Sequence, residues 1–218
     1  MKILILILLC LLVLRFFVVL PWNRLLRKKI TLSPDTKKRA SQRKAIIVLG
    51  SGGHTTEMLN LLTGIDLAQF TPRHYILSET DKISETKGHN FEESRGQNNS
   101  VFHRIPRSRE VLQSYSSSIF TTIKSIFACI KLVITIRPDV VLTNGPGTGF
   151  PVCVAAWFLK FFWNRNLRII FIESFCRVTS MSLTGKLLYY TPIADGIVVQ
   201  WPELERKYPM SQNLGQLV

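Results

Sequence analysis

Apolar and polar positions alternate on two length scales after residue 44 of the chain. Short runs rich in β-branched and aromatic residues are typical of strands that are buried on both faces of a sheet. Longer apolar stretches between these runs are typical of helices. Strands are predicted at residues 45–50, 73–78, 101–106, 139–144, 168–174 and 196–201, and helices at 54–62, within 81–100, and at 115–136, 150–163 and 183–190. Strands that alternate with helices predict the α/β class, with a Rossmann-like parallel sheet covered on both faces.

The N-terminus has a different pattern. Residues 3–20 read ILILILLCLLVLRFFVVL, 18 residues in which Arg15 carries the only charge. This length is near the minimum for a helix that crosses the hydrocarbon core, and Arg15 lies close enough to the end of the run to extend toward the lipid headgroups. The run is not followed by the small-residue cleavage site that a secretory signal peptide requires. We therefore predict an uncleaved transmembrane anchor over residues 1–22.

Basic residues are concentrated directly after this anchor, which changes the meaning of the net charge of +14. Residues 1–44 hold 11 Lys and Arg against the single acid Asp35, whereas residues 45–218 hold 17 basic and 13 acidic residues. Nine of the 11 follow the anchor, so we interpret residues 23–44 as a basic linker beside an anionic membrane surface. By the positive-inside rule the body of the protein faces the cytosol. Nucleic acid is accordingly not expected as a partner.

The rest of the chain is expected to form one domain, residues 45–208, and a short tail, residues 209–218. A domain of roughly 170 residues can bury a substantial hydrophobic core. The tail is polar but carries Leu214, Leu217 and Val218 near its end. We expect these apolar side chains to contact a partner, with a frayed terminus as the alternative. The four cysteines form no CxxC pair, so we expect reduced thiols and no metal site.

The loop GSGGH joins the first strand of the domain to its first helix. Glycine permits a sharp turn, and free N–H groups at a helix N-terminus attract anions such as a diphosphate. The loop is neither a P-loop nor a complete dinucleotide-binding fingerprint, because Thr55 stands where the last glycine of that fingerprint belongs. A tight turn without a ligand is the alternative. The residues expected to bind a diphosphate here are Gly50, Ser51, Gly52, Gly53 and Thr55.

Two further segments lie where predicted strands end: the loop NGPGTGFP after residues 139–144, and the end of the strand at 168–174 with the FCR that follows it. Glu173 interrupts the end of an apolar strand, where a carboxylate is typical of a catalytic or sugar-binding group or of a loop cap. His54 begins a helix and is either a catalytic group or a surface residue. Ligands of this fold bind beyond the carboxyl ends of the strands, where all these segments should meet. The loop NGPGTGFP is wider than a simple turn requires, and a family resemblance described below implies that Asn144, Gly145, Gly147, Thr148 and Gly149 also bind the diphosphate.

A family resemblance rests on these motifs. GSGGH, NGPGTGFP and FIESFCR, in this order, resemble the N-terminal half of GT-B glycosyltransferases related to the bacterial lipid-II-forming GlcNAc transferase. With GSGGHTTEML and a single anchor, the chain is similar over essentially its whole length to the membrane-anchoring subunits of two-subunit UDP-GlcNAc transferases. A GT-B enzyme has a second Rossmann-like domain for the nucleotide sugar. This chain ends soon after its last predicted strand, so we expect a partner to supply that domain.

The resemblance implies an enzyme subunit that is inactive alone. Its soluble partner binds UDP-GlcNAc, and the complex adds the second GlcNAc to GlcNAc-diphosphodolichol during N-glycosylation. The chain is then a single-pass protein of the endoplasmic reticulum membrane with a cytosolic domain, and its glycine-rich loops hold the acceptor diphosphate. Inversion at the anomeric carbon requires a base, for which His54 and Glu173 are the candidates in this chain. No metal or cofactor is implied.

Alternatives stay open on three points. The sequence does not decide between His54 and Glu173 as the base. The aromatic residues within 157–163 face either the lipid interface or the core. Two other functions of the whole chain remain as alternatives. One is a purely structural anchor that contributes no catalytic residue. The other is a membrane-tethered, nucleotide-dependent oxidoreductase, which the incomplete dinucleotide-binding fingerprint disfavours.

Overall fold

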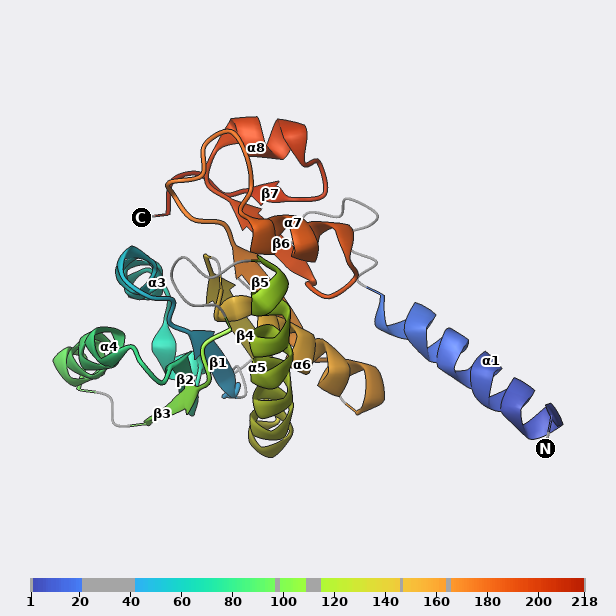
Figure 1. The fold of residues 1–218 in the computed structure, drawn as a ribbon. Helices are drawn as coiled ribbons and strands as arrows, with labels where there is room; N and C mark the ends of the chain where they lie inside the picture. The colour runs from blue at the N-terminus through green and yellow to red at the C-terminus, as the bar shows by residue number, and fades with distance from the viewer. Residues whose placement is uncertain are drawn as a thin grey trace.

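The computed structural model describes residues 2–20, 42–96, 99–108, 115–145, 147–163 and 166–217 (Figure 1). Met1 and residues 21–22 of the predicted anchor lie outside the described residues. So do residues 23–41 of the predicted basic linker and Val218 of the tail.

The described residues form one parallel sheet of seven strands in the order β3-β2-β1-β4-β5-β6-β7. This confirms the fold class expected from the sequence, and each of the six predicted strands is present. The last strand was not predicted, because two residues carry no periodic pattern. The strands are β1 (Ala45–Val48), β2 (Arg73–Ser78), β3 (Ser100–Ile105), β4 (Val140–Asn144), β5 (Arg168–Ile172), β6 (Gly196–Val199) and β7 (Gln212–Asn213).

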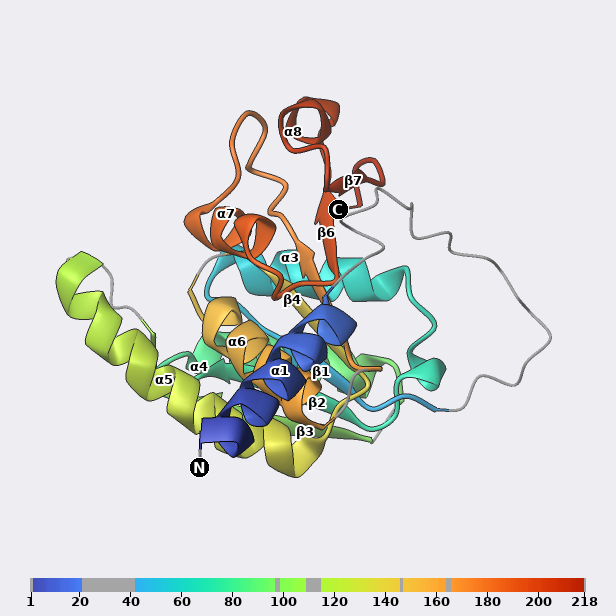
Figure 2. The ribbon, with the colours of Figure 1, turned by 90° about the vertical axis from the view of Figure 1, so that its right-hand side faces the viewer.

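Helices cover both faces of the sheet (Figures 1 and 2). Helices α3 and α4 lie on one face, and α5, α6 and α7 lie on the other. The body helices are α3 (Gly53–Thr63), the 3-10 helix η1 (Leu67–Gln69), α4 (Lys82–Ser94), α5 (Tyr115–Ile136), α6 (Gly149–Phe162), α7 (Leu183–Tyr190) and α8 (Pro202–Lys207).

Alternate residues of the central strands enter two separate cores, as the pleat of a strand requires. Ile46 of β1 faces α5 and α6, where it joins Val133 and Ala156. Ile47 faces α3, where it joins Met58. Both isoleucines are at most 1% exposed, which explains why β1 reads as a continuous apolar run instead of an alternating one.

Helix α1 (Lys2–Val19) contacts α6, and most of its length leads away from the body, as Figure 1 shows. The Arg15 guanidinium donates to the carbonyl oxygen of Phe161 at 2.5 Å and to that of Lys160 at 3.3 Å. These carbonyls belong to the last turn of α6, where helical acceptors have no intrahelical donor. Arg15 therefore satisfies the end of a neighbouring helix, whereas we expected it to extend toward headgroups. Its neighbours Leu14 and Phe17 are more than half exposed.

One helix segment among the described residues, Ser118–Ile136 of α5, is long and apolar enough to cross a membrane, with a mean hydropathy of 1.9. Length and composition alone do not separate a membrane span from a packed helix. Cys129 and Val133 of α5 are buried in the core beside α6, while Phe120 and Phe127 are exposed. The aromatic end of α6 divides in the same way, because Phe161 is buried and Trp163 is exposed.

Candidate functional site

The order of the strands places a ligand-binding crevice between β1 and β4. The chain runs outward from β1 through β2 to β3, and then returns to the other side of β1 as β4. The loops after β1 and β4 therefore leave in opposite directions, and this switch point is where doubly wound sheets bind ligands. Because β5 is the next strand, the three segments singled out in the sequence lie at one edge of the sheet, as expected.

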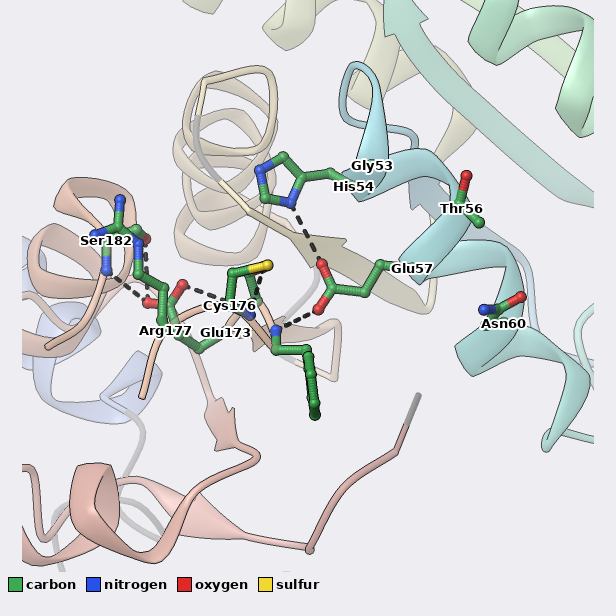
Figure 3. A pocket seen from close by; sticks show the side chains of 11 residues that line it. Gly53, His54, Thr56, Glu57, Asn60, Glu173, Cys176, Arg177 and Ser182 are labelled. Carbon is green, nitrogen blue, oxygen red and sulfur yellow. Dashed lines mark hydrogen bonds and ion pairs between the residues drawn. The ribbon is translucent and has the colours of Figure 1, made fainter. Parts of the chain in front are cut away.

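A pocket of about 700 Å³ opens at this edge (Figure 3). The N-terminal half of α3 forms one wall, and the segment after β5 forms the opposite wall. Its lining residues are Gly53, His54, Thr56, Glu57, Asn60, Glu173, Ser174, Phe175, Cys176, Arg177 and Ser182.

His54 lies in the first turn of α3, and its ring packs against Gly145 of the loop after β4. A Cβ atom at residue 145 would lie 2.7 Å from His54 Cγ and Nδ1, so this approach requires glycine. His54 Nδ1 is 3.3 Å from Glu57 Oε2, and the His54 side chain is 29% exposed. An ionised carboxylate only accepts hydrogen bonds, so we assign the hydrogen of this contact to Nδ1, which in the neutral ring leaves Nε2 with a lone pair.

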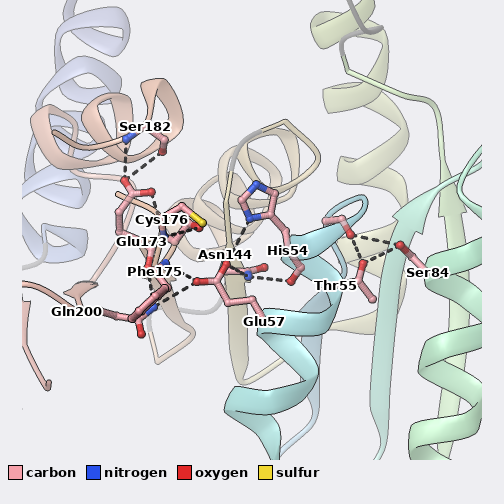
Figure 4. Close-up of polar contacts among 12 residues, drawn as sticks. His54, Thr55, Glu57, Ser84, Asn144, Glu173, Phe175, Cys176, Ser182 and Gln200 are labelled. Atoms are coloured by element: carbon pink, nitrogen blue, oxygen red, sulfur yellow. Dashed lines mark hydrogen bonds and ion pairs between the residues drawn. The ribbon is translucent and has the colours of Figure 1, made fainter. Parts of the chain in front are cut away.

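Glu57 joins four elements of this edge, as Figure 4 shows. Its Oε1 accepts from the Phe175 backbone N–H at 2.5 Å and from Gln200 Nε2 at 3.3 Å. Its Oε2 accepts from His54 and, at 3.3 Å, from Asn144 Nδ2. Burial by itself raises the pKa of this carboxyl. The hydrogen bonds from His54, Phe175 and Ser174 outweigh burial and hold that pKa below its usual value.

The sequence reasoning missed Glu57, although one signal for it existed. Residues three apart on a helix share a face, and Glu57 is three positions after His54. The partners that make Glu57 more than a helical neighbour come from β4, from the segment after β5 and from the end of β6. No local sequence pattern predicts those contacts.

Glu173 is fully buried and is bound to its own loop. Its Oε1 accepts from the Ser174 N–H at 3.1 Å, and its Oε2 accepts from the Ser182 N–H at 2.8 Å and the Ser182 hydroxyl at 3.1 Å. Burial raises the pKa of this carboxyl against the opposing effect of these hydrogen bonds and the charge of Arg177. The geometry favours the loop-capping interpretation of Glu173. Its catalytic role stays a prediction.

Several residues expected at the diphosphate instead support the loops that surround it. Thr55 is fully buried, and its hydroxyl bonds the Gly50 carbonyl and Ser84 Oγ. Asn144 donates to the His54 carbonyl at 2.9 Å, and its Oδ1 has no partner among the described residues. Gly149 packs so closely on the Thr143 hydroxyl that a Cβ would collide with it.

The start of α3 is the part of these loops that is open to an anion. Gly52 is the N-cap of α3 with φ of 65°, and no side chain of the described residues caps the helix there. Gly52, Gly53 and Ser51 are exposed, and Gly53 lines the pocket. Gly147 and Thr148 belong to the other glycine-rich loop and are half-buried outside the pocket lining.

The predicted tail lies close to the same edge. It includes β7, which pairs with β6 in parallel, so the sheet extends past residue 208. Leu217 packs against the cluster of Leu61, Ile172 and Val198, and its backbone N–H donates to Gln200 Oε1 at 3.0 Å. Leu214 is 41% exposed.

A parallel Rossmann-like sheet with glycine-rich loops at its switch point defines the class to which GT-B domains belong. Acinetobacter baumannii MurG matches with a TM-score of 0.52 and 15% identity, over 73% of this chain and 42% of that protein. A UDP-N-acetylglucosamine 2-epimerase from Rickettsia bellii matches with a TM-score of 0.53 and 14% identity, over 81% of this chain and 45% of that protein. At these identities the likeness establishes the fold, and the chain spans less than half of either structure.

The chain belongs to the Alg14 family. The family model described as "Oligosaccharide biosynthesis protein Alg14 like" matches residues 45–217. The UDP-N-acetylglucosamine transferase subunit ALG14 of Mus musculus is 48% identical over 183 residues, 80% of this chain and 83% of that protein. The protein of the same name from Schizosaccharomyces pombe is 37% identical over 184 residues, 83% of this chain and 86% of that protein. The resemblance inferred from the loop motifs is therefore confirmed.

Proposed function

We propose that this chain is the membrane-anchored, acceptor-binding subunit of a UDP-GlcNAc transferase. A soluble partner binds UDP-GlcNAc, and the complex adds the second GlcNAc to GlcNAc-diphosphodolichol on the cytosolic face of the endoplasmic reticulum. The names of the family relatives support the activity. Their designation as a subunit of that transferase supports a separate partner.

The observation that carries the proposal is the placement of His54. Its Nδ1 is held by a carboxylate, and the ring stands at the rim of an open pocket at the switch point of the sheet. Nε2 is then free to accept the proton of the acceptor hydroxyl. The hydroxyl oxygen forms the new bond to the anomeric carbon as the bond from that carbon to the UDP oxygen breaks, and the configuration inverts.

The walls of the pocket supply cationic and dipolar groups for the acceptor diphosphate. The uncapped start of α3 directs backbone N–H groups and the positive end of the helix dipole at the side that Gly53 lines. Arg177 lies on the opposite wall and is exposed, so its guanidinium is available to a phosphate.

The anchor role rests on α1. Its described side chains from Leu9 to Val18 are mostly apolar and exposed in the folded chain, a surface that lipid covers in a membrane. The basic stretch after it, predicted from the sequence, orients the body toward the cytosol.

A transferase assay of the purified two-subunit complex tests the proposal. We expect His54→Ala to lower kcat by about 10² to 10⁴, the usual worth of a positioned base. Glu93→Ala, an exposed change on α4, is the control and should leave the rate unchanged. Full activity of the His54 variant, with normal partner binding, would favour the purely structural anchor.

A further inference from the structure

We propose that Glu57 is the positioning residue of the base, holding His54 in one tautomer and one orientation through its carboxylate. The inference rests on the proposed function, since it concerns how His54 performs that reaction.

Glu57 lines the pocket, but its carboxylate is already bound by protein groups. Oε1 accepts from Phe175 and Gln200, and Oε2 accepts from His54 and Asn144. The Glu57 side chain is 9% exposed. A carboxylate with both oxygens occupied by protein donors acts through the groups it binds, and of these four His54 is the one that can exchange a proton.

The surroundings of Glu57 hold its carboxylate more firmly than a neighbouring residue on the same helix would. An exposed pair of residues three apart on a helix contributes only about 0.2–0.5 kcal/mol. Here the Phe175 N–H and Gln200 Nε2, from the segments after β5 and β6, hold Oε1 in place. Oε2 is therefore directed at His54 Nδ1. The lowered pKa of the Glu57 carboxyl agrees with this, because a carboxylate that stays ionised remains a pure acceptor.

The ring of His54 is restrained by the same group of contacts. Asn144 donates to Glu57 and also to the backbone carbonyl of His54. Gly145 supports the ring directly. When Nε2 takes the acceptor proton, the imidazolium that forms stands beside a negative charge that is already in place, and no group has to move.

The test compares Glu57→Gln with the native complex, because the amide keeps the size of the side chain and removes its charge. We expect kcat to fall at least about tenfold, with the acceptor KM nearly unchanged, as for a lost orienting group. The acidic limb of the pH–rate profile should move to lower pH, because a base without a neighbouring anion is protonated less readily. Glu93→Gln, an exposed change of the same kind, should leave the rate and the profile unaltered.

A double-mutant cycle separates positioning from packing. In the His54→Ala background, Glu57→Gln should cause no further loss of rate. An equal loss in both backgrounds assigns Glu57 a packing role and overturns the inference. If Glu57→Gln fails to fold by thermal unfolding and partner co-purification, Glu57→Asp replaces it. That variant keeps the charge, so it should keep the acidic limb while lowering kcat, and a native kcat would count against positioning.

Different results would overturn the role of His54 as the base and the role of Glu57 as its positioning residue. If His54→Ala keeps full activity, the proposed base is wrong, and this inference is lost with it. If His54→Ala is inactive but Glu57→Gln shows the native rate and pH profile, the proposed function stands and only the inference about Glu57 is overturned.

Discussion

The imidazole of His54 lies directly on the α-carbon of Gly145. A methyl group at residue 145 would approach His54 Cγ and Nδ1 to 2.7 Å. Gly145 also adopts a φ of 65°, a left-handed conformation that other residues adopt at a cost of about 1–2 kcal/mol. One glycine thus turns the loop after β4 and leaves room for the ring of the proposed base.

This relationship predicts the effect of Gly145→Ala. We expect kcat of the complex to fall about 10²-fold, because the ring must move by a large part of an ångström, and misplacement on that scale has this effect. Gly96→Ala is a matched control, because Gly96 has a φ of 63° with open space around its α-carbon. Equal activity of the two variants would mean that the contact with the His54 ring does not matter to the reaction.

Glu173→Gln should lower stability more than it affects chemistry. The Ser174 and Ser182 N–H groups both point at the carboxylate, so one must face the donor group of an amide, at a cost of about 1–3 kcal/mol. We expect a lower Tm and a specific activity close to native for the folded fraction. Loss of activity at unchanged Tm would instead support the catalytic role predicted from the sequence.

The stability of the body should also depend on pH through Glu173. Its pKa is raised in the folded state, so the folded state binds the proton more tightly than the unfolded state. The resulting stabilisation is complete below the usual pKa of Glu and is lost as pH rises through the raised value. Unfolding of native protein and of Glu173→Gln across this range should show a smaller fall in the variant. Parallel curves would contradict this assignment.

Arg15→Leu should keep the chain in the membrane but loosen the contact between α1 and α6. Leucine suits the hydrocarbon, whereas the carbonyls of Lys160 and Phe161 lose their donor, and such hydrogen bonds contribute about 1.5–3 kcal/mol. We expect retention in membranes after alkaline extraction and a lower Tm in detergent. Leu14→Ala, an exposed change on the same helix, is the control. An unchanged Tm in the Arg15 variant would argue against this contact.

The apolar tail should bind the partner through Leu214 while Leu217 holds the tail in place. Leu214→Asp should release the partner in a pull-down, because its exposed side chain is available for burial. Leu183→Asp, an exposed change on α7, is the matched control. Removal of residues 214–218 should lower partner binding and also free Gln200 from Leu217. Unchanged co-purification in both variants would move the interface elsewhere.

The sequence by itself determined the sheet and the loops that shape the site. Strands such as Ala45–Val48 are buried on both faces, so each of them appears in the sequence as a recognisable apolar run. The glycine-rich loops were also recognisable from the sequence, because a positive φ such as that of Gly145 strongly favours glycine. The boundaries of α3, α5, α6 and α7 followed within a residue or two, whereas α8 and the 3-10 helix η1 were not predicted.

Tertiary structure alone decided which side chains the loops bring together. Glu57 is bound by Phe175, 118 positions away, and by Gln200, 143 positions away. Glu173 looked like a catalytic carboxylate because strand ends meet at ligand sites, yet its oxygens are directed at Ser174 and Ser182. Spacing along the chain places residues at an edge of the sheet. The direction of a buried carboxylate depends instead on which donors the fold brings within hydrogen-bonding distance.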